Sequence, residues 1–135
     1  MTEISKQARL ENRLQPQIAD FREERQTIVL STLGNEGLPH VSYAPFARVG
    51  RDYYILISEI AEHTRNLTNS SQVSFMLLED EQNARQLYAR KRLSYKADAQ
   101  LVERKTEVWV TAINELQQRF GEIVDSLSTL SDFKF

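Results

Sequence analysis

Polar side chains that could bind an anion follow an apolar run that ends at Ser58. Four of them lie at the start of an expected short helix: His63, Thr64, Arg65 and Asn66. A strand followed by the first turn of a helix leaves backbone N–H groups without partners, and such groups can bind a phosphate or a carboxylate. The same spacing also fits a short connecting helix whose polar side chains are only solvated.

The remaining candidate ligands are few. Only two histidines are present, His40 and His63, and the absence of cysteine excludes disulfides, thiolate metal sites and a cysteine nucleophile. Arg92 lies in a basic stretch between Arg85 and Lys105, and it could pair with an anion through charge-assisted hydrogen bonds. A solvated strand at a sheet edge explains the same arginine equally well.

Residue patterns predict the elements that position these side chains. An apolar stripe at three- and four-residue spacing predicts two helices within residues 2–25, with a joint near Gln15 because Pro16 should break the helix. Runs rich in β-branched, aromatic and alternating apolar residues predict five strands, over residues 27–33, 38–46, 53–58, 73–78 and 86–102. On the last of them, Arg90 and Arg92 should share one face.

The C-terminal part of the sequence is mainly helical. Residues 103–120 predict a helix with one apolar face, and Gly121 stands where a glycine cap belongs. A second helical piece follows, and residues 132–135 alternate like the start of another strand. Short turns between the first three strands favour an antiparallel sheet, so we expect a mainly β protein, a β-barrel with added helices, in preference to a doubly wound α/β fold.

Length and composition fit a single globular domain. The chain has 135 residues, of which 41% are apolar and 27% charged, and this is enough to form a core of its own. We expect a helical arm over residues 1–25 and a barrel over residues 26–135. A net charge of −2 argues against a nucleic-acid partner. No stretch approaches about 18 consecutive apolar residues and no signal-peptide run begins the chain, so we expect no membrane span and a cytoplasmic location.

Six segments, taken in order, resemble one known family: residues 41–46, 56–58, 63–67, 73–80, 89–94 and 119–123. The chain resembles the FMN-binding split-barrel superfamily that includes pyridoxamine 5′-phosphate oxidase, and most closely its haem-utilisation branch, the HutZ/HugZ-type proteins. The resemblance implies a six-stranded antiparallel split barrel that forms a homodimer, with a planar cofactor at the subunit interface. That branch usually continues with a further strand and a tail that bears the histidine ligand of the haem iron. We therefore expect the C-terminal strand and tail to be cut short and the axial ligand to lie outside this sequence.

The resemblance also implies the residues of the site. It places seven residues at the cofactor: Tyr43, Ser58, His63, Thr64, Arg65, Asn66 and Arg92. Asp132 would lie near the haem, where a carboxylate could orient an iron ligand or polarise dioxygen, although a solvated aspartate fits as well. In the flavin-using relatives an Arg-Lys pair holds the FMN phosphate. Glu62 and His63 stand at those positions here, and a carboxylate repels a phosphate, so we expect haem in preference to FMN.

Three functions remain open at this point. The first is oxidative degradation of haem for haem and iron utilisation, by a homodimer supplied with electrons by a reductant or redox partner. The second is an FMN-dependent oxidoreductase of the pyridoxamine 5′-phosphate oxidase type. The third is a non-catalytic haem carrier or storage protein. An oxygenase and a carrier need the same pocket, so residue types alone do not separate the first function from the third.

Overall fold

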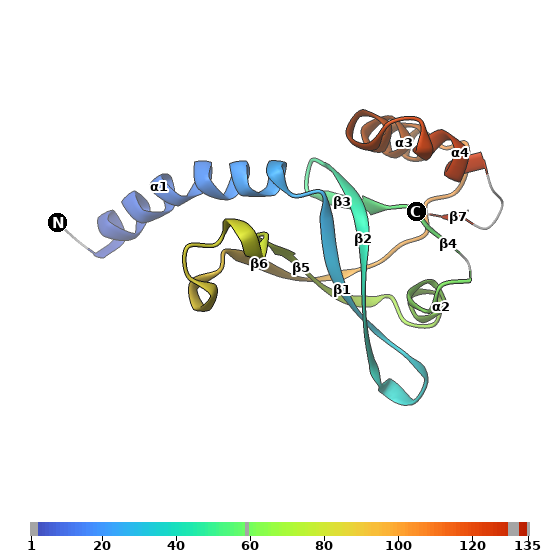
Figure 1. Cartoon of the computed structure of the whole chain (residues 1–135), viewed down its shortest axis with the longest axis horizontal. Helices are drawn as coiled ribbons and strands as arrows, with labels where there is room; N and C mark the ends of the chain where they lie inside the picture. Colours follow the sequence, from blue (N-terminus) through green and yellow to red (C-terminus); the bar gives the residue numbers. More distant parts are fainter. Residues whose placement is uncertain (1–2, 59, 130–132, 135) are drawn as a thin grey trace.

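The computed structural model describes residues 3–58, 60–129 and 133–134. Its centre is a five-stranded sheet with the order β3-β2-β1-β5-β6, and every neighbouring pair is antiparallel (Figure 1). The strands of this sheet are β1 (Thr27–Leu33), β2 (Pro39–Val49), β3 (Asp52–Ile55), β5 (Gln72–Leu78) and β6 (Arg92–Asp98). A separate pair is formed by β4 (Ile57–Ser58) and β7 (Phe133–Lys134). The helices are α1 (Glu3–Glu24), α2 (Glu62–Asn69), α3 (Glu107–Phe120) and α4 (Ile123–Thr129).

Along the strands of the sheet, successive side chains point alternately to a buried face and to an outer face. In β1, for example, Ile28, Leu30 and Thr32 are buried while the residues between them are partly exposed. This period of two is what a strand with one face on the core requires. The buried side chains form the first core, made of Ile28, Leu30, Ala44, Phe46, Ile57, Phe75 and Leu77.

Strand β2 changes partner along its length. It pairs with β1 as far as Pro45, which lies opposite Thr27, and with β3 from Phe46 onward. Proline has no N–H to give to a ladder, so the change of partner is a position where it is tolerated. Phe46 and its neighbour Ala47 are both fully buried, but Phe46 belongs to the first core and Ala47 to a second core beneath α3 and α4.

Helix α3 covers the second core with Trp109, Ala112 and Leu116. It begins at Glu107, four residues later than predicted, because the side chain of Thr106 caps it by accepting a hydrogen bond from the backbone N–H of Trp109. The predicted glycine cap is confirmed: Gly121 has a φ of +83°, a conformation that favours glycine.

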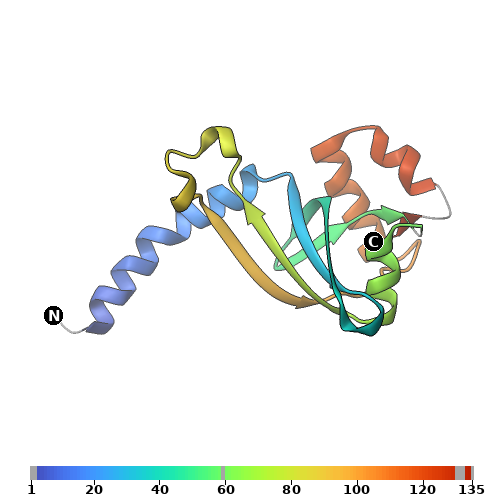
Figure 2. The same cartoon turned by 60° about the horizontal axis from the view of Figure 1, so that its bottom comes forward.

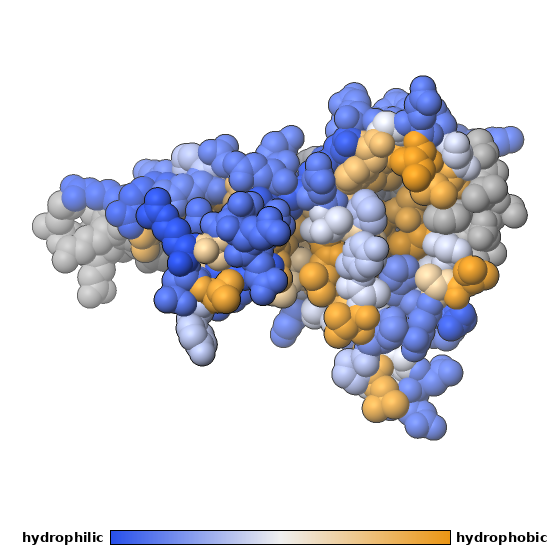
Figure 3. All heavy atoms as spheres, viewed as in Figure 1, coloured by the Kyte–Doolittle hydropathy of each residue, from blue (hydrophilic) through white to orange (hydrophobic). Residues whose placement is uncertain are grey.

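The prediction of two N-terminal helices is wrong. Helix α1 is continuous through Pro16 and projects away from the sheet (Figures 1 and 2). Pro16 cannot donate to the carbonyl of Asn12, but both residues are exposed, so water can satisfy that carbonyl. The surface over α1 is mostly hydrophilic (Figure 3). Near its end, Phe21 packs against the first core and anchors the helix to the barrel.

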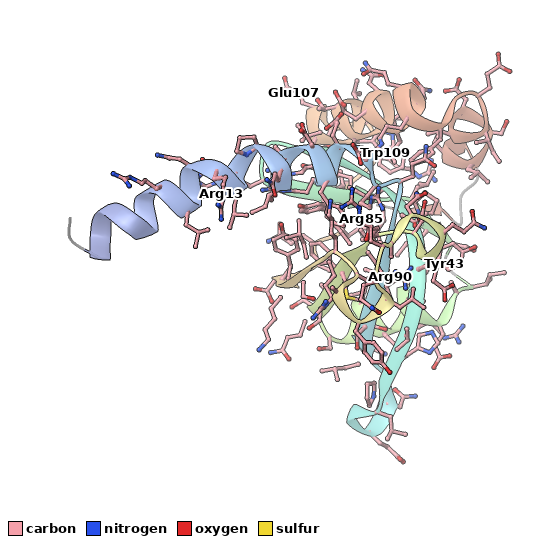
Figure 4. The ribbon with its side chains drawn as sticks, turned by 60° about the vertical axis from the view of Figure 1, so that its left-hand side comes forward. Arg13, Tyr43, Arg85, Arg90, Glu107 and Trp109 are labelled. Carbon is pink, nitrogen blue, oxygen red and sulfur yellow. The ribbon has the colours of Figure 1, made fainter. Side chains whose placement is uncertain are left out.

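The strand predicted over residues 86–102 is confirmed only for Arg92–Asp98, and the predicted length is wrong. Residues Leu87–Ala89 form a 3-10 turn, and only Arg92–Asp98 pair with β5. Side-chain bonds hold the preceding loop out of the sheet: Arg90 Nε donates to the carbonyl of Glu79, and a Glu79 carboxylate oxygen accepts from the N–H of Lys91 at 3.3 Å. Arg90 lies in this loop (Figure 4), so it does not share a strand face with Arg92.

Two further strand predictions concern residues 53–58 and the C-terminus. The predicted strand over residues 53–58 is divided, since β3 pairs with β2 whereas β4 pairs with β7. The strand predicted at the C-terminus is confirmed as β7, and Asp132 lies outside the described residues. In the described part of the chain no helix is long and apolar enough to span a membrane.

Candidate functional site

Helix α2 is attached to the β1–β2 hairpin by three polar side-chain pairs. Each pair joins one residue of α2 to one residue of the hairpin: Glu62 to His40 at 3.3 Å, His63 to Ser42 at 2.7 Å, and Asn66 to Thr32 at 3.0 Å. His40 and Ser42 are two residues apart on β2 and therefore point to the same side, and Thr32 lies opposite His40 on β1. The hairpin thus fixes the face that α2 presents to it.

The turn between β4 and α2 is held by its own side chains. The buried hydroxyl of Thr64 donates to the carbonyl of Ser58 at 2.5 Å, and the guanidinium of Arg65 donates to the carbonyl of Ile60 at 2.9 Å. The N–H of Ile60 approaches the Ser58 hydroxyl at 3.4 Å. The start of α2 is therefore a closed turn in which Thr64 is used internally, whereas Arg65 stays exposed with donors to spare.

A cavity of about 410 Å³ lies between the hairpin and α2. The hairpin side is formed by the turn at Gly34 and by His40, and the helix side by Glu62, Arg65 and Asn69. Its polar groups carry both signs of charge, and Glu62 is already paired with His40. Among the described residues that line the cavity, Arg65 is therefore the permanent cation with donors available for an anionic group.

His63 is the titratable residue at the centre of this arrangement. Burial lowers the pKa of His63, and the nearby charge of His40 lowers it further. The neutral imidazole is favoured near pH 7, with Nδ1 bonded to Ser42. Within the described residues, Nε2 of His63 has no hydrogen-bond partner, so this nitrogen is available to a ligand.

Tyr43 and Arg92 lie on the outer face of the sheet. Tyr43 is 69% exposed and points away from the side occupied by Ser42, because adjacent residues of a strand face opposite ways. Arg92 is exposed at the start of β6, and the side chain of the next residue, Leu93, points the opposite way and packs on the first core. A row of paired residues crosses this outer face: Tyr43, Val29, Met76 and Ser94. Exposed apolar side chains, Val41 and Leu38, extend along the hairpin toward its tip (Figure 3).

Comparison with known proteins identifies the family of the chain. Residues 14–135 match the family model described as pyridoxamine 5′-phosphate oxidase. A Vibrio cholerae protein named heme oxygenase HutZ is 51% identical over 133 residues, which cover 98% of this chain and 76% of that protein. The chain therefore belongs to the pyridoxamine 5′-phosphate oxidase family. Within it, the HutZ type is the branch that the sequence resemblance predicted, and that prediction is confirmed.

Solved HutZ-type structures have the same fold. The crystal structure of Vibrio cholerae HutZ, described there as a heme storage protein, superposes with a TM-score of 0.86 and covers 90% of this chain and 85% of its own. Campylobacter jejuni ChuZ is 32% identical with a TM-score of 0.82, and the match covers 91% of this chain but 51% of that chain. The predicted split-barrel fold with an antiparallel sheet is confirmed.

The structure brings five of the predicted site residues together and places two elsewhere. Ser58, His63, Thr64, Arg65 and Asn66 surround the start of α2, while Tyr43 and Arg92 lie on the outer face. The side chains of Thr64 and Asn66 already have internal partners. Sequence reasoning missed Ser42 and Thr32 as partners of α2. The only signal was that Ser42 follows His40 by two residues and so shares its face.

Proposed function

We propose that this HutZ-type chain binds haem and degrades it oxidatively in haem utilisation, acting as a homodimer. The observation that carries the proposal is the 51% identity, across 98% of the chain, to a protein named heme oxygenase HutZ. A reductant or redox partner would supply the electrons, and the cytoplasm is the compartment we propose. The helical arm of residues 1–25 and the barrel of residues 26–135 would act as one unit.

The residues present fit haem in their chemistry. Haem is a planar apolar ring with two carboxylates, so it needs apolar contacts and cationic or hydrogen-bonding groups at one edge. The chain offers the exposed aromatic ring of Tyr43 beside Val41 for the first requirement. For the second it offers Arg65, Arg92 and the free nitrogen of His63.

Each residue would do one task. Arg65 and Arg92 would neutralise the carboxylates, His63 would donate a hydrogen bond to one of them, and Tyr43 would pack against the ring. Ser58 and the internally bonded Thr64 and Asn66 would hold the start of α2 in place. The bound iron supplies the oxygen chemistry. We propose that Asp132 would orient a ligand of the iron.

The positions of these residues support a homodimer. Tyr43 and Arg92 lie on the outer face of the sheet, whereas His63 and Arg65 belong to α2, which packs on the other face of β2. A rigid planar ligand that contacts both sets would have to lie between the α2 region of one protomer and the outer face of another. Two such sites related by a two-fold axis would then form in one dimer.

Storage of haem without degradation is a second candidate. It is favoured by the description of the Vibrio cholerae HutZ crystal structure as that of a heme storage protein. Binding of FMN is the weaker alternative, because Glu62 stands beside His63 at the start of α2 and would repel a phosphate. Binding of FMN predicts a flavin spectrum, whereas storage predicts a haem band that survives reductant and air.

An absorption titration of the purified protein with haemin and, separately, with FMN tests these functions. We expect a Soret band that saturates near one haemin per subunit and no uptake of FMN. Ascorbate in air should then bleach the band and release iron to a ferrous chelator. A saturated band that survives ascorbate and air would establish storage in place of degradation. A spectrum of free haemin throughout the titration would reject the haem assignment.

A further inference from the structure

We propose that a second cavity, at the end of α1, binds a phosphate group through three arginines. This cavity has a volume of about 220 Å³ and lies where the last turn of α1 meets β2 and α3 (Figure 1). It shares no lining residue with the cavity beside α2, so it is a separate feature of the fold. The proposal goes beyond the haem function and does not depend on it.

Three separate elements each supply one arginine to this cavity. Arg22 comes from the last turn of α1, Arg48 from β2 and Arg119 from α3. The other charged residues of the lining are Glu23 and Glu115. The lining therefore has more positive than negative side chains, and within the described residues no ion pair joins any of these arginines to a carboxylate. The excess positive charge is not neutralised by a close pair within the chain.

Two of the three guanidinium groups have no hydrogen-bond partner in the described part of the chain. Nε of Arg22 is buried without one, and no hydrogen bond of the Arg48 side chain is present there. A buried donor without a partner is unfavourable, because it has lost its contact with water. Burial raises the pKa of the Tyr53 hydroxyl, and the charges of Arg22 and Arg48 act against that rise, so both guanidinium groups lie close to Tyr53 and to each other.

The third guanidinium group, that of Arg119, is only partly used by the protein. Its Nη2 donates to the carbonyls of Glu23 and Arg25 at the end of α1. Among the described residues Nε and Nη1 of Arg119 have no partner, so N–H donors remain on these two nitrogens. Because Arg119 already binds carbonyls at the end of the helix, Arg22 is not needed there as a cap. Each of the three arginines can thus offer N–H donors to an anion.

The size and the donors of the cavity fit a phosphate group, either free or at one end of a small metabolite. Cavities that hold drug-sized ligands have volumes of roughly 300–1,000 Å³, and this one is smaller. Guanidinium groups bind phosphate oxygens through pairs of charge-assisted hydrogen bonds. Glu23 and Glu115 repel the same anion, which limits its affinity.

Calorimetric titration of the full chain with inorganic phosphate, and separately with glycerol 3-phosphate, tests the proposal at constant ionic strength. We expect saturable binding that Arg48→Gln weakens by about tenfold, the effect of one charge-assisted hydrogen bond. Glu115→Gln should strengthen binding, because it removes a carboxylate that repels the anion. Arg51→Gln, in the exposed turn between β2 and β3, is the matched control and should bind like the wild type. Tighter binding of the ester would identify a phosphorylated metabolite as the ligand, and tighter binding of inorganic phosphate would identify the free ion.

Amide spectra of the ¹⁵N-labelled protein test the location. Phosphate should shift the signals of residues 20–26, 46–50 and 115–120 and leave those of α2 unchanged. Arg48→Gln should unfold in urea like the wild type when phosphate is absent, because the side chain is exposed and makes no hydrogen bond within the described residues. Absence of saturable binding by the wild type would overturn the proposal. Binding that Arg48→Gln does not weaken, or shifts confined to another part of the chain, would also overturn it.

Discussion

The side-chain amide of Asn66 donates to the hydroxyl of Thr32 at 3.0 Å, and both residues are buried. This bond links the middle of α2 to the central strand β1. The two other polar pairs of α2, at Glu62 and His63, are closer to its first turn and more exposed. The Asn66–Thr32 pair is therefore the most buried of the three polar contacts that attach α2 to the sheet.

Replacing Asn66 by alanine should lower the free energy of unfolding by about 1–3 kcal/mol, because the Thr32 hydroxyl loses its buried partner. Thr32→Val should cost a similar amount, and the double variant should cost less than the sum of the two. Urea unfolding measures all three. Asn69→Ala, on the exposed side of the same helix, is the control and should change little. Strict additivity of the two single variants would show that the pair is not coupled.

Arg119 should be the main link between α3 and the end of α1. Its Nη2 donates to the carbonyls of Glu23 and Arg25, and its guanidinium lies 4.8 Å from the ring centre of Phe46. Burial, which partly shields the guanidinium from water, lowers the pKa of Arg119. We expect Arg119→Ala to destabilise the protein by about 2–3 kcal/mol.

Hydrogen exchange provides the more specific measurement for this link. In Arg119→Ala the amides of residues 20–26 should exchange faster than in the wild type, whereas those of α2 should not change. Arg51→Ala, in the exposed turn between β2 and β3, is the matched removal of an arginine and should leave both regions unchanged. Equal exchange at residues 20–26 in all three proteins would contradict the role of Arg119.

The lowered pKa of His63 should make stability depend on pH. Below its ordinary value of 6.5 the unfolded protein binds a proton that folded His63 resists, so the free energy of unfolding should fall as the pH decreases from 6.5 to the lower folded pKa. Well above pH 6.5 His63 is neutral in both the folded and the unfolded protein, so it adds no pH dependence to the free energy of unfolding there. The slope of stability against pH just below 6.5 should be smaller in His63→Gln than in the wild type. Identical slopes would show that His63 titrates as it does in the unfolded chain.

Arg92 should contribute to haemin binding only through the carboxylates. Because the side chain is exposed, Arg92→Gln should weaken haemin by about two- to fivefold, the effect of a solvent-exposed ion pair. Haemin dimethyl ester should bind the variant and the wild type equally. Lys96→Gln, on the same face of β6, is the control for a general loss of positive charge. An equal loss for haemin and its ester would point to a change of the sheet surface.

Local patterns predicted much of this fold. The β-branched and apolar composition of residues 27–33 identified β1 with its observed bounds, and the predicted glycine cap at Gly121 was correct. The errors arose where interactions between distant segments, or with water, override a pattern. Solvation of the Asn12 carbonyl lets α1 pass through Pro16, and Arg90 is drawn out of β6 by the carbonyl of Glu79.

The site was predictable only in its position along the chain. Residue types located the anion-binding stretch at the start of α2, but the partners of its side chains come from a hairpin more than 20 residues away. Ser42 has no unusual sequence context, and its role depends on how α2 packs against β2. Similarly, the separation of Tyr43 from His63 follows from the alternation of β2, which sequence predicts, together with the side on which α2 packs, which it does not.

Strand β2 pairs with both β1 and β3, and two adjacent residues of β2 belong to different cores: Phe46 to the first and Ala47 to the second. The core beneath α3 and α4 cannot come apart without exposing Ala47, and any distortion of that backbone also moves Phe46 in the barrel. The two cores should therefore unfold together, and the chain should melt in one cooperative transition. A single inserted residue between Pro45 and Ala47 would turn each core-facing side chain beyond it to the wrong side, so this short segment should be the least tolerant of insertions in the whole barrel.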